Sequence, residues 1–160
     1  MMKRFSLLMV VFSGLFFGCE TTTVVENLTD EEQFEIDLGL IDAYLVENEV
    51  QDVLIHSTDI RYTINEKGSG VSPDASDIVR VDYSGKFLEN DLVFDSNAGA
   101  EFILSQTIAG WVIMVQEMQE GDSFTIYLPS IYAYGRRGSQ PNIPPNSVLI
   151  FDIKLTRVGG

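Results

Sequence analysis

The side chains that most often perform covalent or metal-assisted catalysis are scarce in this chain of 160 residues, which has one cysteine, Cys19, and one histidine, His56. A multi-histidine zinc site or a cysteine-rich cluster needs several such ligands. A Ser-His-Asp mechanism would depend on His56, which lies in a polar stretch without a Gly-x-Ser-x-Gly sequence beside it. We therefore expect chemistry that uses no metal, no cofactor and no nucleophile.

A different kind of chemistry is indicated by aromatic and polar residues in the second half of the chain. Asp95, Trp111 and Tyr134 occupy predicted loop-flanked or helix-start positions, where packing alone has less need of large or polar side chains. Phe102 and Phe151, taken singly, are better explained as core residues of a small β-rich domain. These residue types alone leave two interpretations open, a packed aromatic core and an apolar pocket with a few polar groups.

The elements that must position these residues are short strands separated by turn signals. The predicted strands cover residues 59–64, 77–84, 86–94 with an interruption near 89–91, 101–104, 123–128 and 147–158. One helix is predicted from Ile108 to Gln119, ended by Gly121. This pattern predicts an α+β domain in which an antiparallel sheet half-wraps one short α-helix.

An N-terminal helical extension is predicted before this domain. Thr29-Asp30-Glu31-Glu32 matches a capping box, in which the first and last residues exchange hydrogen bonds at a helix start. An apolar stripe then follows at spacings of four, three and four residues, formed by Phe34, Leu38, Ile41 and Leu45. The helix should end near Asn48, and its stripe should pack either on the domain or on a second subunit.

The first residues have the pattern of a secretory signal, with Lys3 and Arg4 before an apolar run from Phe5 to Phe17. As a helix this run would span about 20 Å, short of the roughly 30 Å hydrocarbon core of a membrane. The run ends in Leu15-Phe16-Phe17-Gly18-Cys19, which resembles a bacterial lipobox. The motif usually has Leu three residues before the cysteine and a small residue after that Leu, and both of these positions are Phe here. The resemblance implies a lipid on Cys19; the alternative is an ordinary cleaved signal with a spare cysteine.

The predicted organisation has three parts: a signal peptide over 1–18, a lipid-anchored tether and amphipathic helix over 19–58, and a folded domain over 59–160. The formal net charge is -14, from 10 Lys and Arg against 24 Asp and Glu. Because such an acidic surface repels nucleic acid and anionic lipid headgroups, we expect neither as a partner. The membrane would be reached through the lipid on Cys19, which predicts an anchored protein of the bacterial cell envelope, on the periplasmic or surface face of the outer membrane.

Several segments of the domain, taken in order, resemble the FKBP-type peptidyl-prolyl cis-trans isomerases. They are Val81-Asp82-Tyr83-Ser84-Gly85, Phe94-Asp95-Ser96-Asn97, Phe102-Ile103-Leu104, Ile108-Ala109-Gly110-Trp111, Tyr132-Ala133-Tyr134-Gly135, Ile143-Pro144-Pro145 and Leu149-Ile150-Phe151-Asp152. The resemblance covers about residues 59–158, and the upstream helix is similar to the extension of secreted bacterial members. It implies an FKBP-like half-wrapped sheet whose helix and loops enclose an apolar pocket.

The resemblance also implies how the pocket is built. Trp111 would form its floor and Ile108 one edge, while Asp95 would orient polar groups at the rim. The walls would come from four aromatic residues: Tyr83, Phe94, Phe102 and Phe151. The residues of this pocket would catalyse by binding alone, which agrees with the scarcity of nucleophiles and metal ligands.

Three further contacts are implied by the same resemblance. The Tyr134 hydroxyl and the Ile143 backbone N–H would bond to substrate or ligand carbonyls, and Thr107 falls where the family offers a backbone carbonyl. The implied activity is rotation about X-Pro bonds in exported or envelope proteins, with proline-containing polypeptides as substrates and macrolides as further ligands. An apolar pocket predicts a preference for a bulky hydrophobic residue before proline.

Two departures from the family pattern leave a second hypothesis open. Ala100 stands two residues before Phe102, where a larger side chain is common, and would open one wall. Val112-Ile113-Met114 replaces acidic residues and a glycine after Trp111, and we expect this apolar stretch beneath the N-terminal helix or at a dimer contact. These features allow a chaperone module that binds proline-containing or hydrophobic peptides with little turnover.

Overall fold

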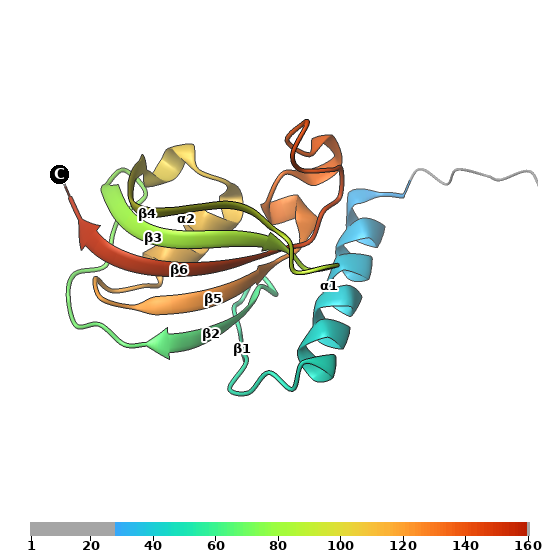
Figure 1. Cartoon of the computed structure of the whole chain (residues 1–160), viewed down its shortest axis with the longest axis horizontal. Coiled ribbons are helices and arrows are strands. Elements are labelled where there is room, and N and C mark those ends of the chain that lie inside the picture. The colour runs from blue at the N-terminus through green and yellow to red at the C-terminus, as the bar shows by residue number, and fades with distance from the viewer. Residues whose placement is uncertain (1–27, 160) are drawn as a thin grey trace, which may run out of the picture.

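The computed structural model describes residues 28–159, so the expected signal sequence and Cys19 lie outside the described residues. One antiparallel sheet has the strand order β1-β2-β5-β6-β3-β4 (Figure 1). Its strands are β1 (Leu54–Ile55), β2 (Arg61–Glu66), β3 (Ile78–Phe87), β4 (Val93–Ile103), β5 (Ser123–Leu128) and β6 (Leu149–Val158). Two α-helices are present in this part of the chain, α1 (Asp30–Glu47) and α2 (Ala109–Gln116). The predicted α+β architecture is confirmed.

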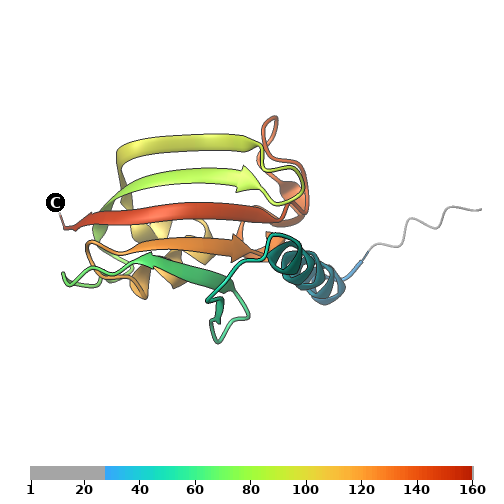
Figure 2. The same ribbon diagram turned by 60° about the horizontal axis from the view of Figure 1, so that its bottom comes forward.

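Short 3₁₀ turns connect several of these elements. They cover Leu104–Gln106, Ser130–Tyr132 and Gly135–Arg137. The strands lie side by side as one twisted sheet with α2 on one of its faces (Figure 2). Within residues 28–159, no helix combines the length and the apolar character needed to cross a membrane.

The main core lies between α2 and the sheet. The alternating residues of β6 that were expected to face one way are at most 3% exposed, namely Leu149, Phe151, Ile153 and Leu155. Val79 and Val81 of β3 are fully buried in the same cluster. Because burying one large aliphatic side chain stabilises a fold by about 1.5–3 kcal/mol, this alternation fixes which face of each strand meets α2.

Helix α1 starts as its sequence predicts. The Thr29 hydroxyl accepts a hydrogen bond from the Glu32 N–H (3.1 Å), and the Glu32 carboxylate accepts one from the Thr29 N–H (2.7 Å). The first turn is acidic, which the positive end of the helix dipole favours. The helix ends at Glu47, and the N–H of its C-cap, Asn48, bonds to the Tyr44 carbonyl.

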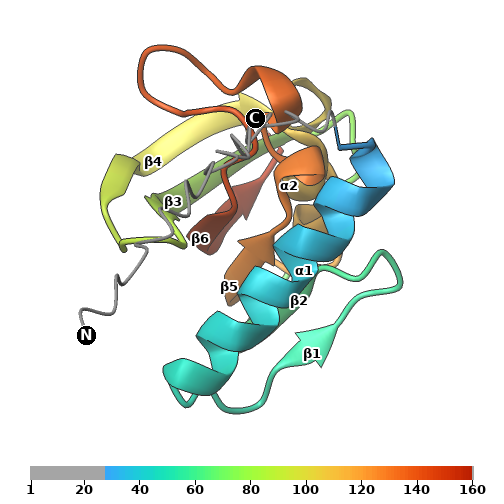
Figure 3. The same cartoon turned by 90° about the vertical axis from the view of Figure 1, so that its right-hand side faces the viewer.

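The apolar stripe of α1 packs on the domain, which answers a question that the sequence left open. Figure 3 looks onto α1 and shows the helix lying across one end of the sheet. Two residues of the stripe, Ile41 and Leu45, belong to a second cluster. Its other members are Leu88, Tyr127, Val148 and Ile150. Ile150 points away from the main core, yet it is 1% exposed because this cluster covers it.

Some elements differ from the prediction, for reasons of tertiary structure. Strand β3 continues through Gly85 to Phe87, and the positive φ of Asp91 (56°) places the turn before β4. Strand β4 merges two segments that were expected to be separate, and β1 was not expected. Helix α2 ends at Gln116, because the chain then turns until the N–H of Gly121 bonds to the Leu155 carbonyl (2.7 Å).

The apolar residues after Trp111 belong to the main core. Met114 is fully buried there, and Ile113 packs against the same cluster. The cluster under α1 does not include either residue. The expectation that this stretch lies beneath the N-terminal helix is therefore wrong for both, since the first turns of α2 face the sheet.

Candidate active site

A cavity of about 340 Å³ opens beside the start of α2. Its lining comes from β3, β4, β6, α2 and the two irregular segments before α2 and after β5. The lining residues are Tyr83, Phe94, Asp95, Phe102, Gln106, Thr107, Ile108, Trp111, Tyr134 and Phe151. All the pocket residues expected from the sequence are present in this lining except Ile143.

Trp111 is the residue that the other aromatic rings surround. Its indole is 4% exposed and meets Tyr83, Phe102 and Phe151 edge to face, with centroids 5.2, 5.7 and 5.4 Å away. Their ring planes lie at 82°, 89° and 84° to the indole, an arrangement that aromatic pairs prefer. Rings that stand nearly perpendicular to the indole form walls around it. The Trp111 Nε1–H is buried without an acceptor among the described residues.

Two glycines make this arrangement possible. A Cβ on Gly85 would lie 2.6 Å from atoms of both Phe94 and Phe151, so the strand can carry no side chain where these rings pass over it. A Cβ on Gly110 would lie 2.6 Å from a Leu128 methyl carbon. Gly110 therefore lets the first turn of α2 approach β5 closely, and this approach brings Trp111 into the cavity.

The rim of the cavity is polar. The Tyr83 hydroxyl donates a hydrogen bond to Asp95 Oδ2 at 2.6 Å. Burial raises the pKa of Tyr83 to about 12, and the hydrogen bond and the negative charge of Asp95 add to this shift. Burial also raises the pKa of Tyr134, with a smaller effect of Asp95. Both phenols therefore keep their protons at neutral pH and remain hydrogen-bond donors.

The backbone donors near the cavity differ from the expectation. Ile143 is 4% exposed, lies outside the lining, and its N–H donates to the Ser139 carbonyl at 2.8 Å. This amide is therefore already satisfied within its own loop. Ile108, by contrast, lines the cavity as the N-cap of α2, and its N–H has no partner within residues 28–159. The structure thus offers Ile108 in place of Ile143 as the backbone donor.

The segment before α2 adds one residue that the sequence interpretation missed. Gln106 lines the cavity from the end of a 3₁₀ turn, next to Thr107. The Thr107 hydroxyl and N–H both bond to the Leu104 carbonyl, at 2.7 and 3.0 Å, which fixes the turn. The sequence did contain a signal that could have placed Gln106 in the site, because it is a polar residue in the irregular segment just before the helix.

The fold and the cavity define a small α+β binding domain, and comparison with known proteins identifies its family. The family model described as FKBP-type peptidyl-prolyl cis-trans isomerase matches residues 70–156. This chain therefore belongs to the FKBP-type peptidyl-prolyl cis-trans isomerases, which confirms the family and enzyme class predicted from the sequence. The fold agrees, since a peptidyl-prolyl cis-trans isomerase from Pseudomonas syringae superposes with a TM-score of 0.69, 26% identity, and coverage of 84% of this chain and 98% of that one.

Two relatives at the sequence level are longer than this chain. A probable FKBP-type isomerase FkpA from Neisseria meningitidis is 41% identical over 123 residues, covering 74% of this chain and 45% of the relative. Outer membrane protein MIP from Legionella longbeachae is 37% identical over 122 residues, covering 73% of this chain and 52% of the relative. The chain thus spans about half the length of these two relatives.

Proposed function

We propose that this chain catalyses the cis-trans isomerisation of X-Pro peptide bonds in exported or envelope proteins. The proposal rests on one observation, the cavity whose walls are aromatic and whose rim carries Tyr83, Asp95 and Tyr134. Catalysis would be non-covalent, with proline-containing polypeptides as substrates. Membership of the isomerase family supports the reaction class.

The physical basis of the proposed reaction is the resonance of the amide. Rotation about the C–N bond breaks this resonance and has a barrier of about 18–20 kcal/mol, so uncatalysed exchange takes tens of seconds or longer. The planar amide is strongly dipolar, whereas the twisted one has lost much of its charge separation. An apolar cavity therefore disfavours the planar ground state more than the twisted transition state, which is the differential binding that catalysis requires.

Seven of the lining residues have a role in this proposal. The proline ring would rest on the Trp111 indole, between walls that include Phe94 and Phe151. The Tyr134 hydroxyl and the Ile108 N–H would donate to substrate carbonyls and hold the twisted geometry. The rim hydrogen bond from Tyr83 would fix the Asp95 carboxylate in place.

The test is isomerisation of short Leu-Pro and Glu-Pro peptides by the purified protein. Lowering the barrier by about 5 kcal/mol corresponds to roughly 10³–10⁴-fold acceleration, and we expect the Leu-Pro peptide to react faster. Phe94→Ala and Asp95→Ala should both lower the rate, whereas Glu47→Ala, at an exposed position at the end of α1, should not. A wild-type rate equal to the solvent background would reject the activity. Loss of activity with retained protection of an unfolded client would favour the chaperone hypothesis.

We also propose that macrolides occupy the same cavity and inhibit the enzyme. The apolar walls and the donors at Tyr134 and Ile108 suit a large apolar ligand that carries carbonyl groups. Inhibition that is competitive with the peptide substrate, and weakened by Phe94→Ala, is the expected result. Inhibition that Phe94→Ala leaves unchanged would place the macrolide elsewhere.

A lipid anchor on Cys19 in the cell envelope is the last part of this proposal. It is supported by the basic start, the apolar run and the Gly18-Cys19 pair, and by similarity to a relative named as an outer membrane protein. Acyl chains stabilise membrane binding by about 0.8 kcal/mol for each buried methylene, so several would anchor the chain firmly. Metabolic labelling with a radioactive fatty acid should mark the wild type, and Cys19→Ser should abolish the label. Equal labelling of both would disprove the anchor.

A further inference from the structure

We infer that α1 is a positioning element of the proposed active site and that Asp37 is its central positioning residue. Asp37 holds the segment 130–137, which follows β5 and contains the lining residue Tyr134. This inference rests on the proposed isomerase activity. It assigns a role in the reaction to a helix that contributes no residue to the cavity lining.

The contact at the centre of this inference is a buried carboxylate. Asp37 is fully buried, and its Oδ2 accepts hydrogen bonds from the Ser130 N–H (2.7 Å) and the Ser130 hydroxyl (2.5 Å). Its Oδ1 accepts a third from Gln33 Nε2 (2.7 Å). A carboxylate is costly to bury unless such bonds replace water, and bonds to a charged acceptor are stronger than neutral ones. Asp37 therefore specifies where Ser130 must lie.

Two further contacts on neighbouring turns of α1 hold the same segment. The Phe34 ring meets the Tyr132 ring edge to face, with centroids 5.9 Å apart. The Arg136 guanidinium bonds to the Asp30 carboxylate (2.6 Å) and to the Leu28 carbonyl. Asp30 thus contacts Arg136, Phe34 contacts Tyr132, and Asp37 contacts Ser130. The segment therefore runs antiparallel to the helix. Tyr134 lies between the points that are held.

The segment has little regular structure of its own. It consists of two 3₁₀ turns, Ser130–Tyr132 and Gly135–Arg137, separated by Ala133 and Tyr134. Internal backbone bonds close only single turns, such as Tyr132 N–H to the Pro129 carbonyl (3.0 Å). Because no strand pairing sets the direction of Tyr134, the contacts from α1 must supply part of that direction.

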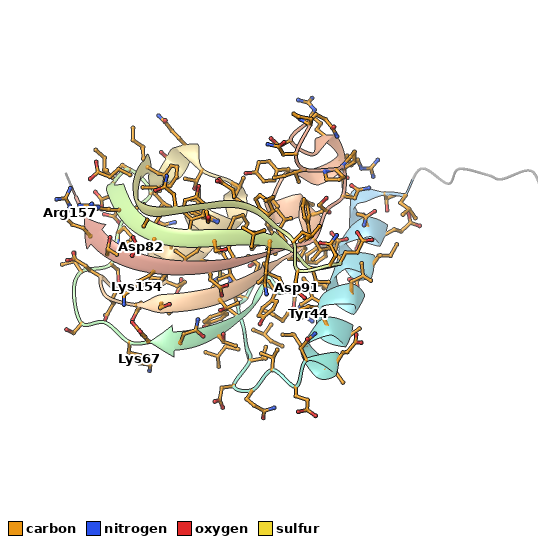
Figure 4. The ribbon with its side chains drawn as sticks, in the orientation of Figure 1. Tyr44, Lys67, Asp82, Asp91, Lys154 and Arg157 are labelled. Atoms are coloured by element: carbon orange, nitrogen blue, oxygen red, sulfur yellow. The ribbon has the colours of Figure 1, made fainter. Side chains whose placement is uncertain are left out.

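The same helix also reaches the other half of the rim. The Tyr44 hydroxyl donates to Asp91 Oδ1 (2.9 Å), which also receives Lys86 Nζ (2.8 Å). Tyr44 and Asp91 lie next to each other where α1 meets the turn between β3 and β4 (Figure 4). This turn leads directly into Phe94 and Asp95. One helix therefore contacts both segments from which the rim is built.

A matched control exists on α1 itself. Asp42 accepts two hydrogen bonds from the buried Arg61 of β2, Nε to Oδ1 and Nη2 to Oδ2, both 2.9 Å. This contact ties the helix to the sheet, whereas the Asp37 contact ties it to Ser130 after β5. The Asp42 contact involves neither the segment 130–137 nor the turn before β4. A variant at Asp42 should weaken the contact between α1 and β2 while it leaves the contacts of α1 to Ser130 and Asp91 in place.

The experiment compares Asp37→Ala with Asp42→Ala in the peptide isomerisation assay. Asp37→Ala should lower kcat/KM about tenfold, because a displaced rim donor no longer meets the transition state, while Asp42→Ala should stay within about twofold of wild type. Asp37→Asn, which keeps an oxygen facing Ser130, should recover most of the activity. Equal kcat/KM values for the two alanine variants would overturn the inference. An inactive wild type would instead reject the proposed function.

A double-mutant cycle separates positioning from general destabilisation. In a Tyr134→Ala background, Asp37→Ala should change kcat/KM by less than about twofold, because the residue through which it acts is gone. A full tenfold loss in that background would show that Asp37 acts in another way and would overturn the inference. If Asp37→Ala folds poorly, Ser130→Ala is a milder variant, because it removes only the hydroxyl that donates to Asp37. Its effect on kcat/KM should also disappear in the Tyr134→Ala background.

Amide hydrogen exchange tests the contact without any assay of activity. Asp37→Ala should speed exchange within residues 130–138, starting at the Ser130 N–H, and Asp42→Ala should not. Unchanged exchange in this segment would overturn the positioning role whatever the kinetics show. Faster exchange combined with an inactive wild type would support the contact while rejecting the proposed reaction.

Discussion

The two faces of the sheet differ in what packs against them. Adjacent residues of one strand point to opposite faces and so lie in these two different environments. Phe151 of β6 lines the cavity, and its neighbour Ile150 lies in the cluster under α1. On the first face, rings stand at steep angles to Trp111 and leave a space of about 340 Å³. On the second, aliphatic side chains such as Ile41 are fully buried. Aromatic residues thus keep a ligand site open on one face, while α1 covers the opposite face only at the end of the sheet that it crosses.

The largest expected effect comes from removing the floor of the open face. Trp111→Ala should lower the free energy of unfolding by about 3–5 kcal/mol and abolish isomerase activity, because three ring contacts and the base of the cavity are lost together. Urea denaturation and the peptide assay measure the two effects. Trp111→Phe, which keeps a ring, is the control and should be less destabilising. A fully stable Trp111→Ala protein would contradict the central place of this residue in the core.

A smaller effect is expected at the glycine beneath the cavity walls. Gly85→Ala places a Cβ 2.6 Å from both Phe94 and Phe151, so the rings must move. We expect a loss of about 1–3 kcal/mol in the free energy of unfolding, as for other overpacked cores, with a clear fall in kcat/KM. Thermal unfolding together with the peptide assay tests this. Activity equal to wild type would mean that the positions of these rings do not govern the reaction.

Helix α1 contains a glycine at which a change of the opposite sign is expected in the free energy of unfolding. Gly39 lies within α1, is exposed, and would have no atom within 4 Å of an added Cβ. Gly39→Ala should therefore raise the free energy of unfolding by about 0.5–1 kcal/mol, through reduced freedom of the unfolded chain and better helix propensity. Activity should not change. A destabilised Gly39→Ala protein would indicate that this side of α1 meets something that the monomer does not contain.

The smallest effect concerns the ion pair of Lys86 and Asp91, where α1 meets the turn between β3 and β4. Hydrogen bonds from Lys86 and Tyr44 lower the pKa of Asp91 below its ordinary value of 3.8. A folded-state pKa below the unfolded one stabilises the protein above the unfolded value, and this contribution is lost as the pH falls through the folded value. Asp91→Asn should cost up to about 0.5 kcal/mol at pH 7, since an exposed pair contributes little, and nothing in strong acid. A difference in unfolding temperature that does not depend on pH would contradict this origin.

The features of the fold that were predictable from the sequence are those set by local physics. The capping box needs only Thr29 and Glu32 three positions apart in one turn, and the burial of Leu149, Phe151, Ile153 and Leu155 follows from the period of two of a strand. Strand β1 could not be predicted, because Leu54 and Ile55 are 42% and 62% exposed and form a strand only by pairing with β2. The burial of Ile150 likewise depends on a helix that is distant in sequence.

The candidate site was predictable in its side chains and less so in its backbone. The aromatic residues and Tyr134 could be assigned to a pocket because the ordered segments that contain them resemble those of the isomerase family. The backbone donor is different, because whether an N–H is free depends on the loop around it. The Ile143 N–H bonds to the Ser139 carbonyl, while the Ile108 N–H, which precedes the first turn of a helix, has no partner among residues 28–159. No residue type signals that distinction.

The single tryptophan of the chain has a practical consequence. Because Trp111 lies at the base of the cavity, in contact with its walls, all of the indole emission of the protein comes from that one place. A peptide or macrolide that enters will alter the emission directly, without any attached dye. Occupancy of the site can therefore be followed by intrinsic fluorescence in the unmodified protein, and variants of α1 that disturb the rim can be ranked by the same signal.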